Sequence, residues 1–421
     1  RVERADKETG LGEPRLRGEL VRTTTQLRFL ADRSGAADTL DAVIDSGNPN
    51  AQPPVPELRR VNRPLGPVAV FGASNFPFAF STPGGDVASA LAAGCPVVVK
   101  AHPAHPGTSE IVGRLAVQAV ADAGLLPGWF SMLHGTEHRV GTTLVQHPEI
   151  RAVAFTGSLA GGRALFDIGA KRPNPIPVFA EMSSLNPTFV FPDALTQATA
   201  TMLVDSFLLG VGQFCTKPGV IVVPDDALGH EFNRLVGLEL VTRASGTMLT
   251  ARMAESVSRL VEMSVEAGAT KVACQDSGAL AASGSGVLLQ ATLNHFLRSR
   301  ALSKEHFGPV ALLVNSPVEQ FKRVFEVVEG SLTATVFAAN FEQRHLSELL
   351  ATSANHAGRV LMNQVPTGVR VSPAMVHGGP YPSTTASATT SVGSAAIRRF
   401  LRPVSFQNMP DKLLPEALRD E

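Results

Sequence analysis

Hydrophobic and polar residues follow different periods in different parts of the chain. Over residues 1–45 the apolar positions recur near helical spacing among arginines and glutamates, which predicts helix through this stretch. Residues 47–56, GNPNAQPPVP, are turn- and linker-forming residues and indicate a boundary. From residue 66 onward, short apolar runs of strand type alternate with helix-type patterns.

The alternation after residue 66 predicts βαβ units. A helix is expected over 86–93, closed by Gly94, and another, capped by Thr108 or Ser109, is expected to run to Ala123. The expected strands are short apolar runs at 67–71, 96–100, 129–133 and 152–155. Strands separated by helices imply a parallel sheet and therefore an α/β fold. Because ligands bind such sheets at the carboxyl ends of strands, we expect chemistry just after residues 71, 100 and 155.

A second α/β stretch spans residues 184–395. Its expected strands are 220–223, 287–289, 311–314 and 360–363. Segment 378–395 is rich in Gly, Ser, Thr and Ala and is expected to be an irregular loop. Residues 400–406, FLRPVSF, alternate like an edge strand, and Pro403 favours an edge position.

Composition narrows the class of protein. The 421 residues suggest two to three domains, and 37 basic against 37 acidic residues argue against a nucleic-acid binder that works through bulk charge. Three cysteines cannot form a disulfide framework, so we expect a reducing, cytoplasmic location. No apolar run approaches the roughly 20 residues of a membrane helix. We expect no metal ion. The chain begins at Arg1 inside a helix pattern, which suggests a trimmed N-terminus.

Cys215 is the first candidate for chemistry. It lies in GVGQFCTKPG, where a glycine-rich loop can expose a thiol and leave a backbone N–H free to bind an oxyanion. A nearby cation, with Lys217 two residues away, would favour the thiolate. The alternative is an inert buried cysteine. Cys95 and Cys274 are expected to be packing residues of that kind.

Two more candidates follow apolar segments. Glu181 in FAEMSSLNP ends a strand-like run, and apolar surroundings would raise its pKa and suit a general base. Its alternative is a capping or ion-paired glutamate. Asn75 in FGASNFPFAF follows a strand and has an amide that can complete an oxyanion hole. Its alternative is an ordinary turn asparagine.

Two further positions suit a phosphate or a ribose. In AFTGSLAGGRAL, residues 154–165, a strand leads through a glycine-rich turn into a helix, which offers free N–H groups to a phosphate. Lys100 ends the run VVVK at the same kind of sheet edge, where it can bind ribose or phosphate oxygens or simply be solvated.

Together, and in this order, these motifs resemble the aldehyde dehydrogenase superfamily. Glu181 precedes Cys215 by 34 residues, as in the family. The matching segments are SNFP with Asn75, VVVKAHP with Lys100, FTGS at 155–158, Glu181, GQFC with Cys215 and EHFGP at 305–309. The resemblance implies a Rossmann-type cofactor domain, an α/β catalytic domain and a small oligomerisation extension. The expected division is 1–46 and 65–183 for the cofactor domain, 184–395 for the catalytic domain, and 47–64 with 396–421 for oligomerisation.

The resemblance also implies roles. Cys215 would attack the aldehyde, with the oxyanion held by the Asn75 amide and the Cys215 backbone N–H, and Glu181 would activate water to hydrolyse the resulting thioester. At the nicotinamide end of the cofactor, Glu305 would bind the ribose and Phe307 would pack near the nicotinamide ring. At the other end, Lys100 would contact the adenosine ribose, and Gly157 with Ser158 would bind the pyrophosphate.

Departures from the family pattern bear on the cofactor. Pro103 stands where members that prefer NAD often have a glutamate, so NADP is permitted and NAD remains possible. Arg139 is a candidate for the 2′-phosphate. Ser183-Ser184 replaces a common Gly-Gly pair. His306 replaces the usual aliphatic residue and is expected to be solvated.

Longer segments, including GASNFPFAFSTPGGDVASALAAGCPVVVKAHPAHPGTSE, EMSSLNP and HGGPYPSTT, resemble the branch that oxidises 2-oxoglutarate semialdehyde. Such a substrate needs a cation for its far carboxylate, and the candidates are Arg22, Arg28 and Arg370. Phe76 and Phe214 would shape the aldehyde channel or pack in the core. The alternatives are an NADP-dependent fatty aldehyde dehydrogenase, a CoA-acylating enzyme or a non-catalytic relative. A homodimer or homotetramer is expected, with no nucleic-acid or membrane partner.

Overall fold

A five-stranded, fully parallel sheet organises the first half of the chain in the computed structural model, which describes residues 1–276 and 282–420. The strand order is β5-β4-β3-β6-β7. The strands are β3 (Val68–Phe71), β4 (Val97–Lys100), β5 (Phe130–Leu133), β6 (Ala152–Thr156) and β7 (Val178–Glu181). The expected strands up to residue 155 are confirmed because their apolar runs are buried by helices on the sheet faces.

The helices that connect these strands are α4 (Gly85–Ala92), α5 (Pro106–Asp122), α6 (His138–Gln146) and α7 (Leu159–Lys171). Helix α5 begins two residues before the expected cap at Thr108 or Ser109. Proline at its first position suits helix geometry. The N–H groups of Gly107 and Thr108 in the first turn have no partner within the helix. They donate to the Glu8 carboxylate at 2.8 Å, so the cap comes from a residue distant in the sequence.

The N-terminal region forms α1 (Val2–Thr9), α2 (Glu13–Ala31) and α3 (Ala37–Leu40), followed by the strand β1 (Val43–Asp45). The expectation of helix through residue 45 is therefore wrong at its end, because β1 pairs with a later strand. Helix α2 packs on α4. Its buried Glu19 accepts the N–H groups of Phe78 and Ala79 at 2.7 and 2.8 Å, which fixes the loop after β3.

The second half of the chain forms a seven-stranded sheet with the order β11-β13-β14-β9-β8-β15-β16. All neighbours are parallel except β11 and β13. The strands are β8 (Thr188–Val190), β9 (Val220–Pro224), β11 (Thr270–Cys274), β13 (Val287–Thr292), β14 (Val310–Ser316), β15 (Ser331–Phe337) and β16 (Ala357–Met362). The helices are α8 (Gln197–Leu208), α9 (Ala227–Val241), α10 (Ala251–Glu266), α11 (Leu293–Arg298) and α12 (Arg344–His356). A short ribbon joins β10 (Gly246–Thr247) and β12 (Ser283–Gly284).

The cysteines outside the expected site differ in burial. Cys95 is buried beside β4, as predicted. Cys274 is exposed, so the prediction of a packing residue is wrong there. It ends β11, which is an edge strand of the seven-stranded sheet and buries little of its length.

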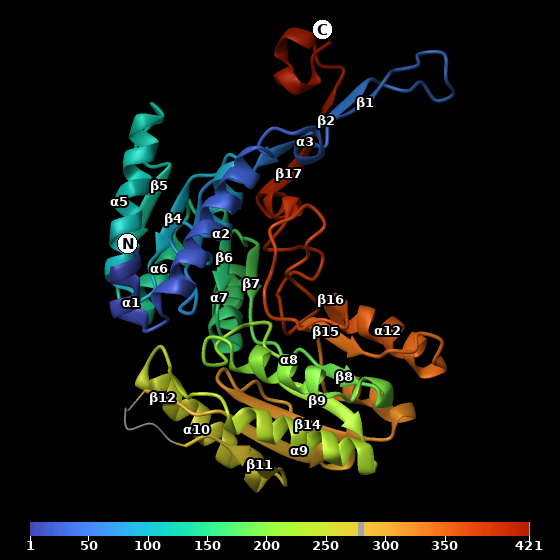
Figure 1. The fold of residues 1–421 in the computed structure, drawn as a ribbon. Helices are drawn as coiled ribbons and strands as arrows, with labels where there is room; N and C mark the ends of the chain where they lie inside the picture. Colours follow the sequence, from blue (N-terminus) through green and yellow to red (C-terminus); the bar gives the residue numbers. More distant parts are fainter. Residues whose placement is uncertain (277–281, 421) are drawn as a thin grey trace.

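A three-stranded antiparallel sheet projects from the molecule as an arm (Figure 1). It consists of β1, β2 (Leu58–Pro64) and β17 (Leu401–Gln407), with β2 in the centre. The expected strand at 400–406 and its edge position are confirmed, and Pro403 lies opposite Asn62. Short 3-10 helices complete the chain: η1 (Pro192–Ala194), η2 (Val318–Glu326), η3 (Ser394–Phe400), η4 (Asp411–Leu413) and η5 (Glu416–Leu418). Residue 421, the end of the expected tail, lies outside the described residues.

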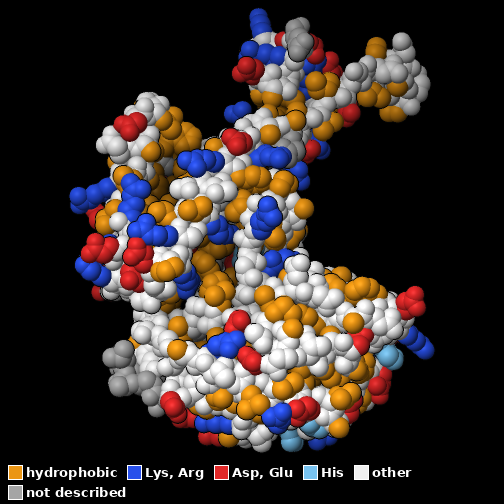
Figure 2. Space-filling model, in the orientation of Figure 1, with side chains coloured by type: hydrophobic (Ala, Val, Ile, Leu, Met, Phe, Trp, Pro, Cys, Tyr) orange, Lys and Arg blue, Asp and Glu red, His pale blue; other side chains and the backbone are white. Residues whose placement is uncertain are grey.

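In the view of Figure 1 the five-stranded sheet lies above the seven-stranded sheet, and the arm lies at the top. Basic and acidic side chains are interspersed over the face shown in Figure 2. Among the described residues, no helix has both the length and the apolar character needed to cross a bilayer.

Candidate active site

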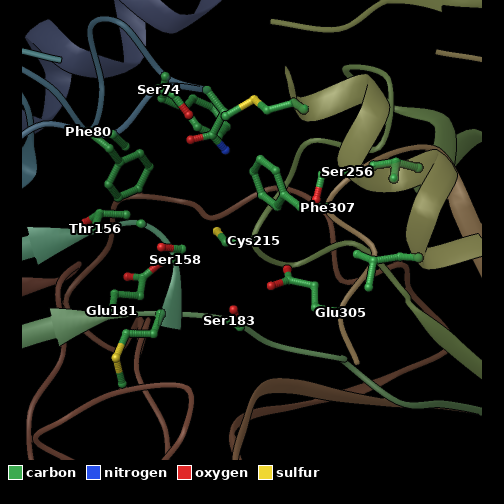
Figure 3. Close-up of a pocket in the computed structure, with 18 residues that line it drawn as sticks. Ser74, Phe80, Thr156, Ser158, Glu181, Ser183, Cys215, Ser256, Glu305 and Phe307 are labelled. Carbon is green, nitrogen blue, oxygen red and sulfur yellow. The ribbon is translucent and has the colours of Figure 1, made fainter. Parts of the chain in front are cut away.

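A cavity of about 300 Å³ lies between the carboxyl ends of β3, β6 and β7 and helix α10 (Figure 3). This is the edge of the sheet where chemistry is expected. Residues far apart in the sequence meet here. The expected site residues that line the cavity are Asn75, Phe76, Gly157, Ser158, Glu181, Cys215, Glu305 and Phe307.

The loop between α8 and β9 presents Cys215. Gly210 and Gly212 in this loop have positive φ values of 58° and 66°, and a Cβ on Gly212 would lie 2.1 Å from the Gly308 carbonyl oxygen. Glycine is therefore required for the close approach. Asn186 holds the far side of the loop, because its Nδ2 donates to the Cys215 carbonyl at 2.8 Å and to the Lys217 carbonyl at 2.9 Å.

The electrostatic surroundings disfavour a thiolate at Cys215. Burial raises the pKa of the Cys215 thiol well above its usual value, and the charges of Glu181 and Glu305 raise it further. The expected cation does not help, because Lys217 Nζ donates to the Val310 carbonyl at 2.6 Å. Burial lowers the pKa of Lys217 itself to about 8. The expectation that a neighbouring cation favours the thiolate is therefore wrong for the free protein.

Glu181 ends β7 and is buried at the back of the cavity. Its Oε2 accepts the Ser391 hydroxyl at 2.7 Å, and its Oε1 lies 2.8 Å from Nε2 of His377. Burial acts to raise the pKa of Glu181, but the charge of His377 and the hydrogen bond from Ser391 outweigh it, so the pKa is lowered. The expected raised pKa is wrong because the carboxylate has polar partners in its apolar surroundings.

His377 is a site residue that the sequence reasoning missed. Its side chain is 2% exposed, and Nε2 lies 3.4 Å from Cys215 Sγ. The backbone N–H of His377 donates to the Thr390 hydroxyl at 2.8 Å, which holds it within the loop after β16. The sequence carries one signal for it, a histidine directly before Gly-Gly in HGGP at the start of the irregular loop.

Asn75 connects the loop after β3 to the cysteine loop. Its Nδ2 donates to the Gln213 carbonyl at 2.8 Å, two residues before Cys215. Its backbone carbonyl accepts Arg15 Nη2 at 2.6 Å. An amide has two N–H groups, so the second remains for an oxygen bound in the cavity.

Glu305 and Phe307 line the cavity on the side opposite Glu181, so Cys215 lies between Glu181 and Glu305 in Figure 3. Burial raises the pKa of Glu305 to about 7. His306, expected to be solvated, is buried instead: Nε2 lies 3.1 Å from Ser264 Oγ. Burial lowers the pKa of His306 to about 4. This contact ties the segment to α10 and orients the two residues that flank His306.

The turn after β6 fits an anionic ligand. Ser158 caps α7, a helix of 13 residues, and its hydroxyl accepts the Gly161 N–H at 3.2 Å. The first N–H groups of such a helix attract a phosphate. Gly157 has no space for a side chain, since a Cβ would lie 2.6 Å from the Phe155 ring. With the Glu305 carboxylate facing the same cavity, the residues present fit a nicotinamide dinucleotide.

Other expected cofactor residues lie outside this cavity. Lys100 Nζ donates to the backbone carbonyls of Ala101, at 3.0 Å, and Gly135. Burial lowers the pKa of Lys100. Arg139 is exposed at the start of α6, with Nε 3.9 Å from Glu137. Its contact with a 2′-phosphate stays a prediction.

The expected substrate residues fall into two groups. Arg22 is half-buried on α2, with its guanidinium carbon 4.9 Å above the ring of Phe80, which lines the cavity. Arg28 and Arg370 are exposed. Phe76 lines the cavity, whereas Phe214 is buried behind it, with the two ring centroids 5.0 Å apart.

The two sheets and the cavity between them place the protein among the α/β enzymes. The chain belongs to the aldehyde dehydrogenase family, whose sequence profile, described as "Aldehyde dehydrogenase family", matches residues 6–403. It is thus an oxidoreductase that uses a nicotinamide cofactor.

Curated relatives match nearly the whole chain. It is 47% identical to alpha-ketoglutaric semialdehyde dehydrogenase 2 of Azospirillum brasilense, over 100% of this chain and 81% of that protein. It is 44% identical to alpha-ketoglutaric semialdehyde dehydrogenase of Acinetobacter baylyi, over 99% and 80%. Among solved structures, succinic semialdehyde dehydrogenase from Streptococcus pyogenes in complex with NADP+ matches with a TM-score of 0.79 and 18% identity, over 96% of this chain and 85% of that one. This last match shows the shared fold.

Proposed function

We propose that the protein oxidises 2-oxoglutarate semialdehyde to 2-oxoglutarate with NADP or NAD. The two curated relatives carry this name at 47% and 44% identity over almost all of the chain. The observation that carries the proposal is the convergence of Cys215, Glu181 and Asn75 on one cavity that also contains Glu305.

The chemistry begins at the thiol. Because burial and two carboxylates raise its pKa, the thiol needs a nearby acceptor for its proton. Neutral His377 can take that role, since its Nε2 lies 3.4 Å from the sulfur, and the charge that His377 then gains is the one that Glu181, 2.8 Å away, stabilises. The sulfur adds to the aldehyde carbon, and the oxyanion accepts N–H groups from the Asn75 amide and the Cys215 backbone.

Two steps then complete the oxidation. A bound nicotinamide would accept hydride from the carbon that the sulfur has attacked, and a thioester on Cys215 would remain. Glu181 removes a proton from water, the hydroxide attacks the thioester carbonyl, and the carboxylate product leaves as the thiol reforms. Glu305 would hold the ribose hydroxyls and Phe307 would pack beside the nicotinamide. Ser158 and Gly157 would bind the pyrophosphate, and Lys100 would contact the adenosine ribose.

Arg22 supports a substrate with a second carboxylate. Its Nε donates to the Val369 carbonyl at 3.2 Å and its Nη1 to Gln26 at 3.0 Å, but the buried Nη2 has no hydrogen-bond partner among the described residues. Burial lowers the pKa of Arg22, and the charges of Glu19, Cys215 and Glu181 act in the opposite direction, so Arg22 is within electrostatic range of the catalytic candidates. A carboxylate bound beside Phe80 would pair with this free N–H group.

NADP is the proposed cofactor, with NAD as the alternative. The position of Pro103 carries no carboxylate to repel a 2′-phosphate. We further propose a cytoplasmic homodimer or homotetramer. Residues 1–46 and 65–183 would form the cofactor domain, 184–395 the catalytic domain, and 47–64 with 396–421 the oligomerisation part.

A substrate panel tests the proposed function. The purified protein is assayed with 2-oxoglutarate semialdehyde, pentanal and decanal, each with NADP and with NAD. We expect kcat/KM to be highest for the semialdehyde, since pentanal has a similar length and no carboxylate. A higher value for decanal would instead establish the fatty aldehyde alternative. Product analysis with and without CoA separates hydrolysis from acylation.

A further inference from the structure

Three potential metal ligands meet at the back of the cavity. Glu181, Cys215 and His377 each offer one ligand atom, and these atoms lie within 4.8 Å of one another. The Sγ–Nε2 distance is 3.4 Å and the Nε2–Oε1 distance is 2.8 Å. The Glu181 and His377 side chains are 5% and 2% exposed. Oε1 of Glu181 lies at ion-pair distance from His377 and accepts no hydrogen bond of good geometry from the described residues.

This donor set matches a zinc ion in kind and in spacing. Thiolate, imidazole and carboxylate are the ligands that zinc takes in proteins, with bonds of about 2.3 Å to sulfur and about 2.0 Å to nitrogen. At tetrahedral angles these bond lengths separate sulfur from nitrogen by about 3.5 Å, close to the distance observed here. The carboxylate must move away from the imidazole by only about half an ångström.

The surroundings complete the site. Ser391 donates to the second oxygen of Glu181 at 2.7 Å, which orients the carboxylate as metal sites require. Cys215 and Glu181 line the cavity, so water can fill a fourth position on that side. Hard cations such as Mg²⁺ prefer six oxygen ligands and are not expected to bind three donors of this kind.

We propose that Cys215, His377 and Glu181 form a binding site for Zn²⁺ that inhibits the enzyme reversibly. Zinc replaces the thiol proton, which passes to solvent, and holds the sulfur that would attack the aldehyde. This inference goes beyond the proposed function and does not depend on the substrate, because it uses only the positions of three side chains.

Alkylation of the cysteines tests the site without an activity assay. The full chain is treated with iodoacetamide with and without Zn²⁺, and the modification of each cysteine is followed by mass spectrometry. At a zinc concentration ten times the Kd, we expect Cys215 to react roughly tenfold more slowly. Cys274 is exposed and serves as the internal reference, which should be unaffected. EDTA should restore the reaction at Cys215, and Mg²⁺ should not slow it.

The His377→Gln variant identifies the ligand. In this variant we expect Zn²⁺ no longer to slow the alkylation of Cys215. The alkylation rate of each protein with Zn²⁺ is compared with the rate of the same protein without metal. Equal zinc protection in this variant would overturn the proposal, and so would equal protection of Cys215 and Cys274 in the unaltered protein.

Cobalt provides a second readout that does not need a stable His377 variant. Co²⁺ added to the Cys274→Ser protein should bind one ion per chain and give a thiolate-to-metal charge-transfer band. Prior alkylation of Cys215 should remove that band. A protein that shows no band, or one that keeps it after alkylation, contradicts the proposed ligand set.

Discussion

Two carboxyl groups, those of Glu181 and Glu305, lie on opposite sides of the Cys215 sulfur in Figure 3, and their surroundings differ. Glu181 lies beside His377 and Ser391, and its pKa is lowered, so it is a carboxylate at neutral pH. Burial raises the pKa of Glu305 to about 7, although a hydrogen bond from Ser183 and the charge of the buried Lys217 act to lower it. The two carboxylates therefore titrate in different ranges, which allows their roles to be separated experimentally.

Replacement of the two catalytic candidates should stop the reaction at different stages. Cys215→Ala removes the nucleophile, so no reduced cofactor should form. Glu181→Gln should permit a burst of one equivalent of reduced cofactor and then slow steady-state turnover roughly 100-fold or more, because the thioester persists. Stopped-flow absorbance of the reduced cofactor measures both. The exposed Cys274→Ser variant is the control and should behave like the unaltered protein. A Glu181→Gln protein with normal turnover would remove this residue from the mechanism.

Cofactor affinity should depend on pH through Glu305. Its pKa of about 7 means that the neutral acid predominates below pH 7 and the carboxylate above it. Because the carboxylate is the stronger acceptor for ribose hydroxyls, we expect the Kd of the cofactor to fall as the pH rises from 6 to 8. Isothermal titration calorimetry across that range measures the effect. Glu305→Gln should weaken binding about tenfold at pH 8 and flatten the profile. An unchanged profile in that variant would assign the pH dependence elsewhere.

Sequence motifs predicted which residues meet at the cavity but not their protonation. Cys215, Glu181, Asn75 and Glu305 stand in recognisable segments, so their convergence could be expected from the resemblance. The lowered pKa of Glu181 depends on His377, which lies 162 residues beyond Cys215 and enters through an irregular loop. No local pattern specifies that contact.

At the scale of elements, helix α2 positions the loop that contributes Asn75. Arg15, Glu19 and Arg22 lie about one turn apart, and all three face this part of the molecule. Arg15 binds the Asn75 carbonyl, Glu19 binds the next turn of the loop, and Arg22 stacks over Phe80. The helix thus connects the oxyanion side of the cavity to the cation proposed for the substrate tail.

Arg22→Gln tests this role of α2. Loss of the charge should raise the KM for 2-oxoglutarate semialdehyde roughly 10- to 100-fold, because the far carboxylate loses its charged partner. The KM for pentanal should change little, since that aldehyde has no carboxylate. Arg28→Gln, on the exposed side of the same helix, is the matched control. Equal effects on both aldehydes would indicate a structural role for Arg22 rather than substrate recognition.

The strands show why some elements were predictable and others were not. The apolar run of β9 is buried throughout, and that of β4 is buried at alternate residues and half-buried between them; both runs stand out in the sequence. In β15, Ser331, Thr333 and Thr335 alternate with apolar residues, yet every residue is buried. Thr333 donates to the buried Asn186, so this polar face is inside the protein. The pattern alone does not distinguish such a strand from a loop.

At the scale of the whole molecule, the arm is the part that projects away from the five- and seven-stranded sheets (Figure 1). Within the described part of the chain, its two edge strands, β1 and β17, each pair with β2 alone, and unpaired edges favour association with another chain. Val43 and Ile44 on β1 and Val55 nearby are exposed at 38%, 49% and 44%. Apolar side chains are visible along this arm in Figure 2. An unpaired edge strand with exposed apolar side chains is a template for association, which supports the proposal that the arm is an interface between copies.

Substitution on the arm should therefore change the size of the particle. Ile44→Asp places a charge on the edge strand, so we expect light scattering to show a smaller species than for the unaltered protein at equal concentration. Leu228→Asp, at an exposed position of α9 in the other half of the molecule, is the control and should leave the mass unchanged. The active-site residues lie outside the arm, so a dissociated Ile44→Asp protein should still bind the cofactor. If Ile44→Asp keeps the full mass while Leu228→Asp reduces it, the interface lies on the catalytic half and the arm has another role.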